Sequence, residues 1–105
     1  MDTQTIERTT LSNLIYNENY ARKVLPFIKG KYFDAREERI IFEEISNFVD
    51  KYKKIPTQTS LEIEVGERKD LSEIEYKKVV DIIKTLNPVE VDFDWLVDHT
   101  EKFCK

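Results

Sequence analysis

The chain has 105 residues, of which 17 are Lys or Arg and 21 are Asp or Glu, so its net charge at neutral pH is −4. This length predicts one domain, residues 1–105, with a modest core. Two glycines and three prolines are too few for the many tight turns of a β-sandwich or barrel. The aromatic content of 11% argues against disorder, because disordered chains lack the apolar groups that offset ordering entropy. The composition therefore predicts a compact, mainly helical protein.

Features that report on cellular location favour the cytoplasm. Cys104 is the single cysteine and cannot form a disulfide within the chain, which fits a reducing compartment. The polar N-terminus, residues 1–5, lacks the basic and apolar regions of a signal peptide. No apolar run approaches the roughly 20 residues of a membrane helix. We therefore expect a cytoplasmic protein without a membrane partner.

Two short helices are expected at the start of the chain. Leu11, Leu14 and Ile15 follow the helical period and predict a helix over residues 5–16. Asn17 is suited to cap a second helix over residues 18–25. Pro26 should end that helix, because proline disfavours helical geometry in the residue before it.

The third expected helix has the strongest pattern. Asp34 is a candidate N-cap, with Glu37 three residues later as in a capping box, and the helix should reach about residue 54. Its apolar stripe follows the helical period and consists of Ile41, Ile45, Phe48, Val49 and Tyr52. Ile40 and Phe42 widen this stripe. We therefore expect a central helix in which Phe48 is buried.

Three further helices are expected in the second half. Thr57 should cap a short helix, which Gly66 should end in a left-handed conformation. Apolar and charged residues alternate over 62–65 as in a strand, but we favour a helix because a lone strand has nothing to pair with. Ser72 and Glu75 form the capping box of the next, whose stripe runs from Tyr76 to Ile83. The last starts near residue 94. The sequence thus predicts an all-α, compact bundle of five to six helices.

Residues for catalysis, cofactor binding or metal binding are not evident. The pattern G-x-x-x-x-G-K-[ST] needs two glycines five apart, and Gly30 and Gly66 are the only glycines. His99 and Cys104 are too few for a zinc site, since zinc takes three or four protein ligands. The acids Glu90, Asp92 and Asp94 do not fit a calcium loop and are expected to complement a helix N-terminus. The pairs Glu37/Glu38 and Glu43/Glu44 are expected on a solvated face.

Two features remain as candidates for binding. The basic-aromatic stretches at residues 29–33 and 51–54 resemble surfaces that bind single-stranded nucleic acid, but the net negative charge disfavours that role. Trp95, His99 and Phe103 lie on one side of the last expected helix and form a possible protein interface, with burial in the core as the alternative. From the residues alone, the chain is a helical domain without an active site of its own.

The order of these features resembles a known family. The stretches that carry the resemblance are residues 11–20 (LSNLIYNENY), 24–28 (VLPFI), 31–33 (KYF), 40–45 (IIFEEI), 52–57 (YKKIPT) with Leu61, 94–97 (DWLV) and 100–103 (TEKF). Together they are similar to the N-terminal domain of DnaB-type replicative DNA helicases, most closely those of T-even-like tailed bacteriophages. The similarity covers nearly the whole chain and rests on an apolar pattern with a few fixed points.

The resemblance implies a non-catalytic collar domain of a hexameric helicase. In such helicases, N-terminal domains pack with one another and contact primase and other replisome proteins of the primosome. A RecA-like ATPase domain, which this chain lacks, binds ATP and single-stranded DNA and unwinds the duplex at the replication fork. No catalytic residue of the family falls on a position here, and a phage protein of this kind would act in the host cytoplasm.

The rival interpretation is a free-standing helical adaptor that binds a replication or host factor. The last expected helix is still amphipathic at Lys105, so we expect the natural chain to continue. A downstream G-x-x-x-x-G-K-[ST] motif in the reading frame would favour the helicase, and a stop codon would favour the adaptor.

Overall fold

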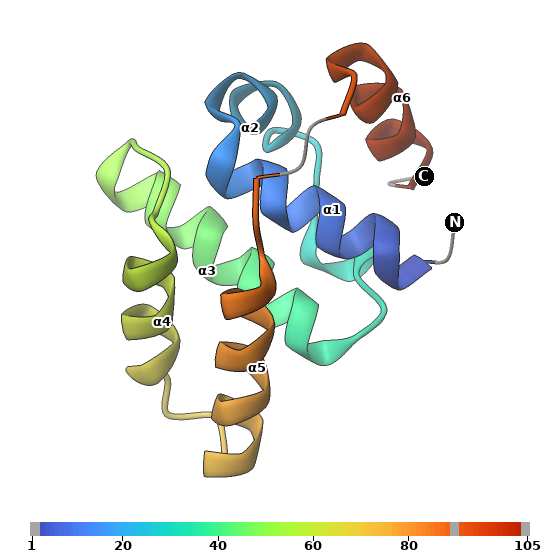
Figure 1. Cartoon of the computed structure of the whole chain (residues 1–105). Coiled ribbons are helices and arrows are strands. Elements are labelled where there is room, and N and C mark those ends of the chain that lie inside the picture. The colour runs from blue at the N-terminus through green and yellow to red at the C-terminus, as the bar shows by residue number, and fades with distance from the viewer. Residues whose placement is uncertain (1–2, 89–90, 104–105) are drawn as a thin grey trace.

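The expected all-α fold is confirmed in a computed structural model, which describes residues 3–88 and 91–103, with the side chains of 5–88 and 91–102 (Figure 1). These residues form six α-helices and one 3-10 turn, with no strand among them: α1 (Thr3–Tyr16), α2 (Glu18–Val24), η1 (Gly30–Tyr32), α3 (Arg36–Tyr52), α4 (Gln58–Gly66), α5 (Glu73–Thr85) and α6 (Phe93–Phe103). Residues 62–65 are helical, as expected. None of the described helices is long and apolar enough to cross a membrane.

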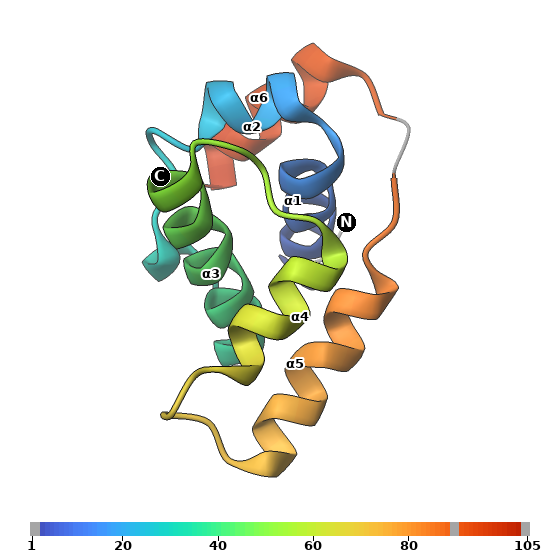
Figure 2. The ribbon, with the colours of Figure 1, turned by 90° about the vertical axis from the view of Figure 1, so that its left-hand side faces the viewer.

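The helices form two groups, one containing α3 and the other containing α1. In one group, α3, α4 and α5 pack against one another, and α4 and α5 form a hairpin (Figures 1 and 2). In the other, α1 packs on α2, and α2 contacts α6. The contact between α1 and α3 joins the groups. This arrangement leaves α6 at the opposite end of the molecule from the loop between α4 and α5 (Figure 1).

One core cluster runs through both groups. Leu11 and Leu14 of α1, Ile41 and Ile45 of α3 and Ile83 of α5 are fully buried in it. Close packing of such side chains is the main source of stability in a domain of this size. The apolar stripes expected for these three helices are confirmed at these positions.

Side-chain N-caps form at three of the four sites that the sequence predicts. Asn17 Oδ1 accepts a hydrogen bond from the Tyr20 amide at 3.1 Å, and Thr57 Oγ1 accepts one from the Ser60 amide at 3.1 Å. At α5 both halves of the capping box form, because Ser72 Oγ accepts from the Glu75 amide and Glu75 Oε1 accepts from the Ser72 amide. Each cap satisfies amides that have no partner inside the helix.

The capping box expected at Asp34 and Glu37 is wrong. The N-cap of α3 is Ala35, with no side-chain hydrogen bond to the helix. The buried carboxylate of Glu7, from α1, interacts instead with the backbone amides of Asp34 and Ala35. The amide of Asp34, to which Glu37 would bond in the expected capping box, thus interacts with a residue distant in sequence.

The ends of α3 and α4 also differ from expectation. Lys53 follows α3 in a left-handed conformation with φ 57°, although it is not glycine, so α3 stops at Tyr52. Gly66, expected to be left-handed, is instead the last helical residue of α4 and has no positive φ. The amide of Glu67 closes α4 by donating to the carbonyls of Ile63 and Glu64.

The buried stripe of α3 is shorter than expected. Phe48 is half-buried, and its ring packs at a tilt against that of the exposed Tyr52 with 4.7 Å between ring centroids. The core side of the helix is formed by Ile40, Ile41, Phe42 and Ile45. The prediction of a buried Phe48 is therefore wrong, because α3 extends past the helices that cover its first half.

Candidate interaction surface

The aromatic side chains of α6 supply a surface beside α1. Trp95 and His99 lie one turn apart, and their ring centroids are 4.1 Å apart. Trp95 is 37% exposed, whereas His99 is half-buried. The start of the helix is fixed by Asp92, whose Oδ1 accepts from the Trp95 amide at 2.9 Å. This confirms Asp92 as an acid that serves a helix N-terminus.

The other side of α6 is held in the core. Leu96, Val97 and Thr100 are buried, and the Thr100 hydroxyl is hydrogen-bonded to the fully buried Tyr20 hydroxyl of α2. Thr100 also donates to the carbonyl of Leu96 at 2.8 Å. The helix is therefore fixed through one face, which leaves Trp95 directed outward.

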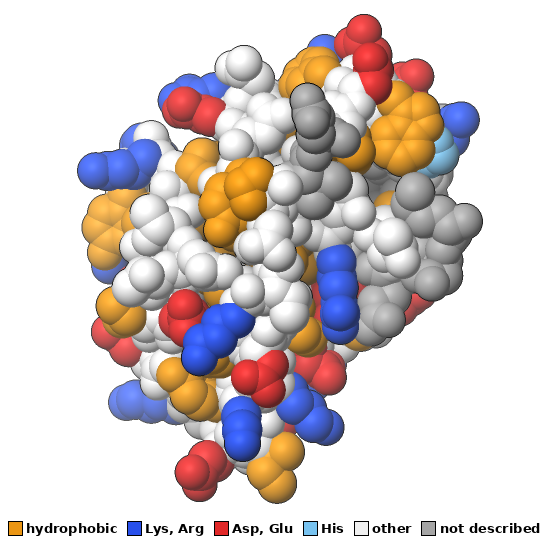
Figure 3. Space-filling model, viewed as in Figure 1, with side chains coloured by type: hydrophobic (Ala, Val, Ile, Leu, Met, Phe, Trp, Pro, Cys, Tyr) orange, Lys and Arg blue, Asp and Glu red, His pale blue; other side chains and the backbone are white. Residues whose placement is uncertain are grey.

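The predicted interface residues divide into two groups. Trp95 and His99 lie together, and we call this pair the α6 surface. The side chain of Phe103 and the whole of Cys104 and Glu90 lie outside the described residues. In Figure 3, apolar side chains gather around α6, whereas those over the α4–α5 hairpin are scattered among charged groups.

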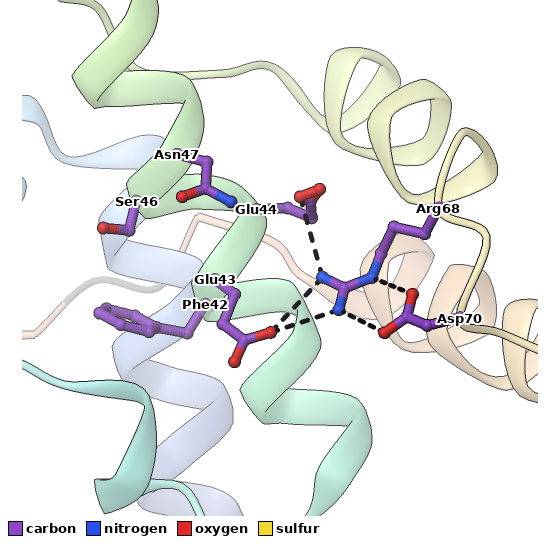
Figure 4. Close-up of a pocket in the computed structure, with 7 residues that line it drawn as sticks. All are labelled: Phe42, Glu43, Glu44, Ser46, Asn47, Arg68 and Asp70. Carbon is purple, nitrogen blue, oxygen red and sulfur yellow. Dashed lines mark hydrogen bonds and ion pairs between the residues drawn. The ribbon is translucent and has the colours of Figure 1, made fainter.

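A network of charges connects α3 to the loop between α4 and α5 (Figure 4). Arg68 donates to both carboxylate oxygens of Asp70, at 3.0 and 2.9 Å, and its guanidinium lies 3.4 Å from Glu43 and 3.9 Å from Glu44. The hydrogen bond with Arg68 lowers the pKa of Asp70, whereas burial raises the pKa of Glu44. The network borders a pocket of about 560 Å³. Because Arg68 faces all three carboxylates, we interpret it as a structural link.

Three charged side chains near the α1–α3 contact were not predicted as a cluster. Glu7 and Glu38 are 2% and 1% exposed, and Arg8 lies 3.8 Å from Glu38. Burial raises the pKa of both carboxyl groups. Glu7 precedes the buried Leu11 by four residues, and this spacing is the signal that places it on the core side of α1.

The expected solvated face is therefore wrong for Glu38 and Glu44, since both are buried. Each faces an arginine, Arg8 or Arg68 respectively, which partly offsets the cost of burying charge. Over the part of the chain that the structure describes, no three His, Cys, Asp or Glu residues are placed to hold a metal ion. Glu38 and Glu44 have arginine partners, Glu7 interacts with backbone amides, and Glu44 also lines the pocket beside Arg68.

Comparison with known proteins decides the family. Residues 2–93 match the DnaB-like helicase N terminal domain, which covers α1 to α5 and ends at the first residue of α6. The chain belongs to this family. It is also 32% identical over 95 residues to a DnaB-like replicative helicase of Enterobacteria phage T4, and the alignment covers 90% of this chain. The same alignment covers 20% of that relative, so this DnaB-like domain spans about a fifth of its length. The resemblance inferred from the sequence is thereby confirmed.

Proposed function

We propose that this domain is the non-catalytic N-terminal part of a replicative DNA helicase, where it promotes ring assembly and docks primase or other replisome proteins. The observation that carries the proposal is the family match over residues 2–93 together with a T4 relative described as a replicative helicase. Since the chain spans a fifth of that relative, the larger part of such a protein supplies the remaining functions.

In this proposal the motor chemistry lies outside the domain. ATP binding, contact with single-stranded DNA and duplex unwinding belong to an ATPase domain elsewhere in the longer protein. The domain itself has glycines only at positions 30 and 66, which cannot form a phosphate-binding loop. A phage-encoded helicase of this type acts in the cytoplasm of the host cell.

The α6 surface is the proposed contact with a neighbouring subunit, to which the sequence prediction adds Phe103. Large aromatic side chains contribute disproportionately to protein interfaces when they are desolvated at the contact. Trp95 is open to solvent in the single chain although its ring packs at a tilt against that of His99, so a neighbour gains by covering it.

The test compares two aromatic-to-acid substitutions in the longer protein. Trp95→Glu places a charge in the α6 surface, whereas Tyr76→Glu alters an aromatic residue of matched exposure, 38%, on α5. We expect Trp95→Glu to shift sedimentation from hexamer to smaller species, because the charge must be desolvated at the contact. Tyr76→Glu should leave the hexamer intact.

Thermal melting of the 105-residue chain with each substitution serves as the control for folding. If both variants melt at nearly the same temperature as the unchanged chain, the sedimentation effect of Trp95→Glu is due to the interface and not to unfolding. An intact hexamer with Trp95→Glu would remove the α6 surface from the subunit contact.

A further inference from the structure

A groove with an aliphatic floor lies between α2, the end of α3 and the segment that follows it. The floor is formed by Leu25, Pro26, Val49 and Ile55, and the groove encloses about 430 Å³. Three of these residues are half-buried and Pro26 is exposed, so apolar surface is accessible along the groove. The groove lies apart from the α6 surface and shares no residue with it.

The groove continues toward the end of α1. An adjoining hollow of about 280 Å³ shares Glu18, Lys54 and Ile55 with it and is also lined by Ile15 and Tyr16. Tyr16 is exposed. Through these shared residues the groove extends to a second hollow whose lining is both polar and apolar.

The rim of the groove carries more positive than negative charge. Its charged residues are the cations Arg22, Lys53 and Lys54 and the acids Glu18 and Asp50. Glu18 is already paired with Arg22 at 2.7 Å. Lys53 and Lys54 are exposed and form no ion pair within the described part of the chain. In a chain of net charge −4, these two lysines make the groove a local site of positive charge.

We propose that the groove binds a short segment of a partner protein in which aliphatic side chains alternate with acidic ones. The aliphatic floor suits Leu, Ile or Val of the ligand, and Lys53 and Lys54 complement its carboxylates. Single-stranded DNA is disfavoured, because bases bind by stacking on aromatic rings, the floor has none, and Tyr16 alone is aromatic among the residues that line the adjoining hollow. This inference names the partner chemistry for the docking role and rests on the proposed function for the partner being a protein.

The experiment uses fluorescence anisotropy with the 105-residue chain. One labelled probe is a short synthetic peptide with Leu and Ile between Asp residues, and its matched control has Lys in place of every Asp. We expect the Asp peptide to bind and the Lys peptide to bind at least about tenfold more weakly, since the second meets like charge on the rim. A labelled oligothymidine is the third probe.

Charge reversal on the rim supplies the matched variants. Lys54→Glu should weaken binding of the Asp peptide about five- to tenfold, because it replaces attraction by repulsion at both hollows. Lys69→Glu makes the same change at an exposed lysine in the loop between α4 and α5 and should have almost no effect. Thermal melts of both variants confirm folding.

Chemical-shift changes locate the bound peptide independently of the variants. Amides of Leu25, Val49, Lys54 and Ile55 should shift on titration with the Asp peptide, whereas that of Trp95 should not. Three outcomes would each overturn the proposal. The two peptides could bind equally well, or the two variants could lose equal affinity for the Asp peptide. Oligothymidine could also shift the groove amides more strongly than the peptide does. Because this assay needs only the 105-residue chain, its failure is distinct from a failure of ring assembly.

Discussion

At the scale of single residues, Glu7 is a buried acid whose charge is costly to the folded state. Desolvation raises its pKa above 4.5, and the carboxylates of Glu38 and Asp34 raise it further, while the amides of Asp34 and Ala35 oppose the rise. One of its oxygens is buried without a hydrogen-bond partner. The folded chain therefore binds this proton more tightly than the unfolded chain does.

The difference between the pKa of Glu7 in the folded and unfolded chain determines how stability changes with pH. The stability contributed by Glu7 is complete below about pH 4.5 and is lost as pH rises through the higher folded-state pKa. We predict that Glu7→Gln, which is neutral at every pH, raises the free energy of unfolding at neutral pH by about 1 kcal/mol. The gain should vanish in acid. Urea titrations at neutral and acidic pH measure both values, with the exposed Glu67→Gln as control; a loss of stability at neutral pH would contradict this account.

Two phenylalanines of contrasting burial give a second prediction. Phe33 is fully buried and stacks on Phe42 with ring centroids 5.1 Å apart, whereas Phe48 is half-buried against Tyr52. Phe33→Ala should lower the free energy of unfolding by about 3–5 kcal/mol, because it leaves a cavity. Phe48→Ala should cost only about 1 kcal/mol. Equal losses in denaturant titrations would place Phe48 back in the core.

At the scale of elements, Gly66 distinguishes two accounts of how α4 ends. As a helical residue, it is replaceable by alanine, whose Cβ would lie at ordinary contact distance, 3.4 Å, from the ring of Tyr76. We therefore predict that Gly66→Ala raises the free energy of unfolding by roughly 0.5 kcal/mol, since alanine restricts the unfolded chain. A left-handed Gly66 would instead make the change destabilising. The shift in melting temperature decides between these signs.

Local chemistry explains why the helices themselves could be predicted. Ser72 and Glu75 form their capping box from residues within one turn, and the stripe from Val79 to Ile83 needs only the helical period. Asp34 does not cap α3, and the amides of Asp34 and Ala35, just before that helix, interact with Glu7 of α1. Such long-range partners are not encoded in any local pattern.

At the scale of the whole molecule, the candidate site was predictable only in part. The spacing of Trp95 and His99 put them on one side of a helix, and the structure confirms that their rings meet. Leu96, which follows Trp95 in the chain, is buried, because α6 uses the face that carries it to dock on α2. The groove beside Val49 and Ile55 was not predicted, since it forms from three segments that meet only in the folded chain.

The central claim is that this DnaB-like domain contributes to ring assembly in a longer helicase. Sedimentation velocity of that protein, with and without residues 1–105, tests the claim most directly. We predict that the intact protein sediments as a hexamer and that the shortened protein, at the same concentration, sediments mainly as smaller species, because it has lost the contacts between N-terminal domains. A shortened protein that sediments as the same stable hexamer would contradict the claim.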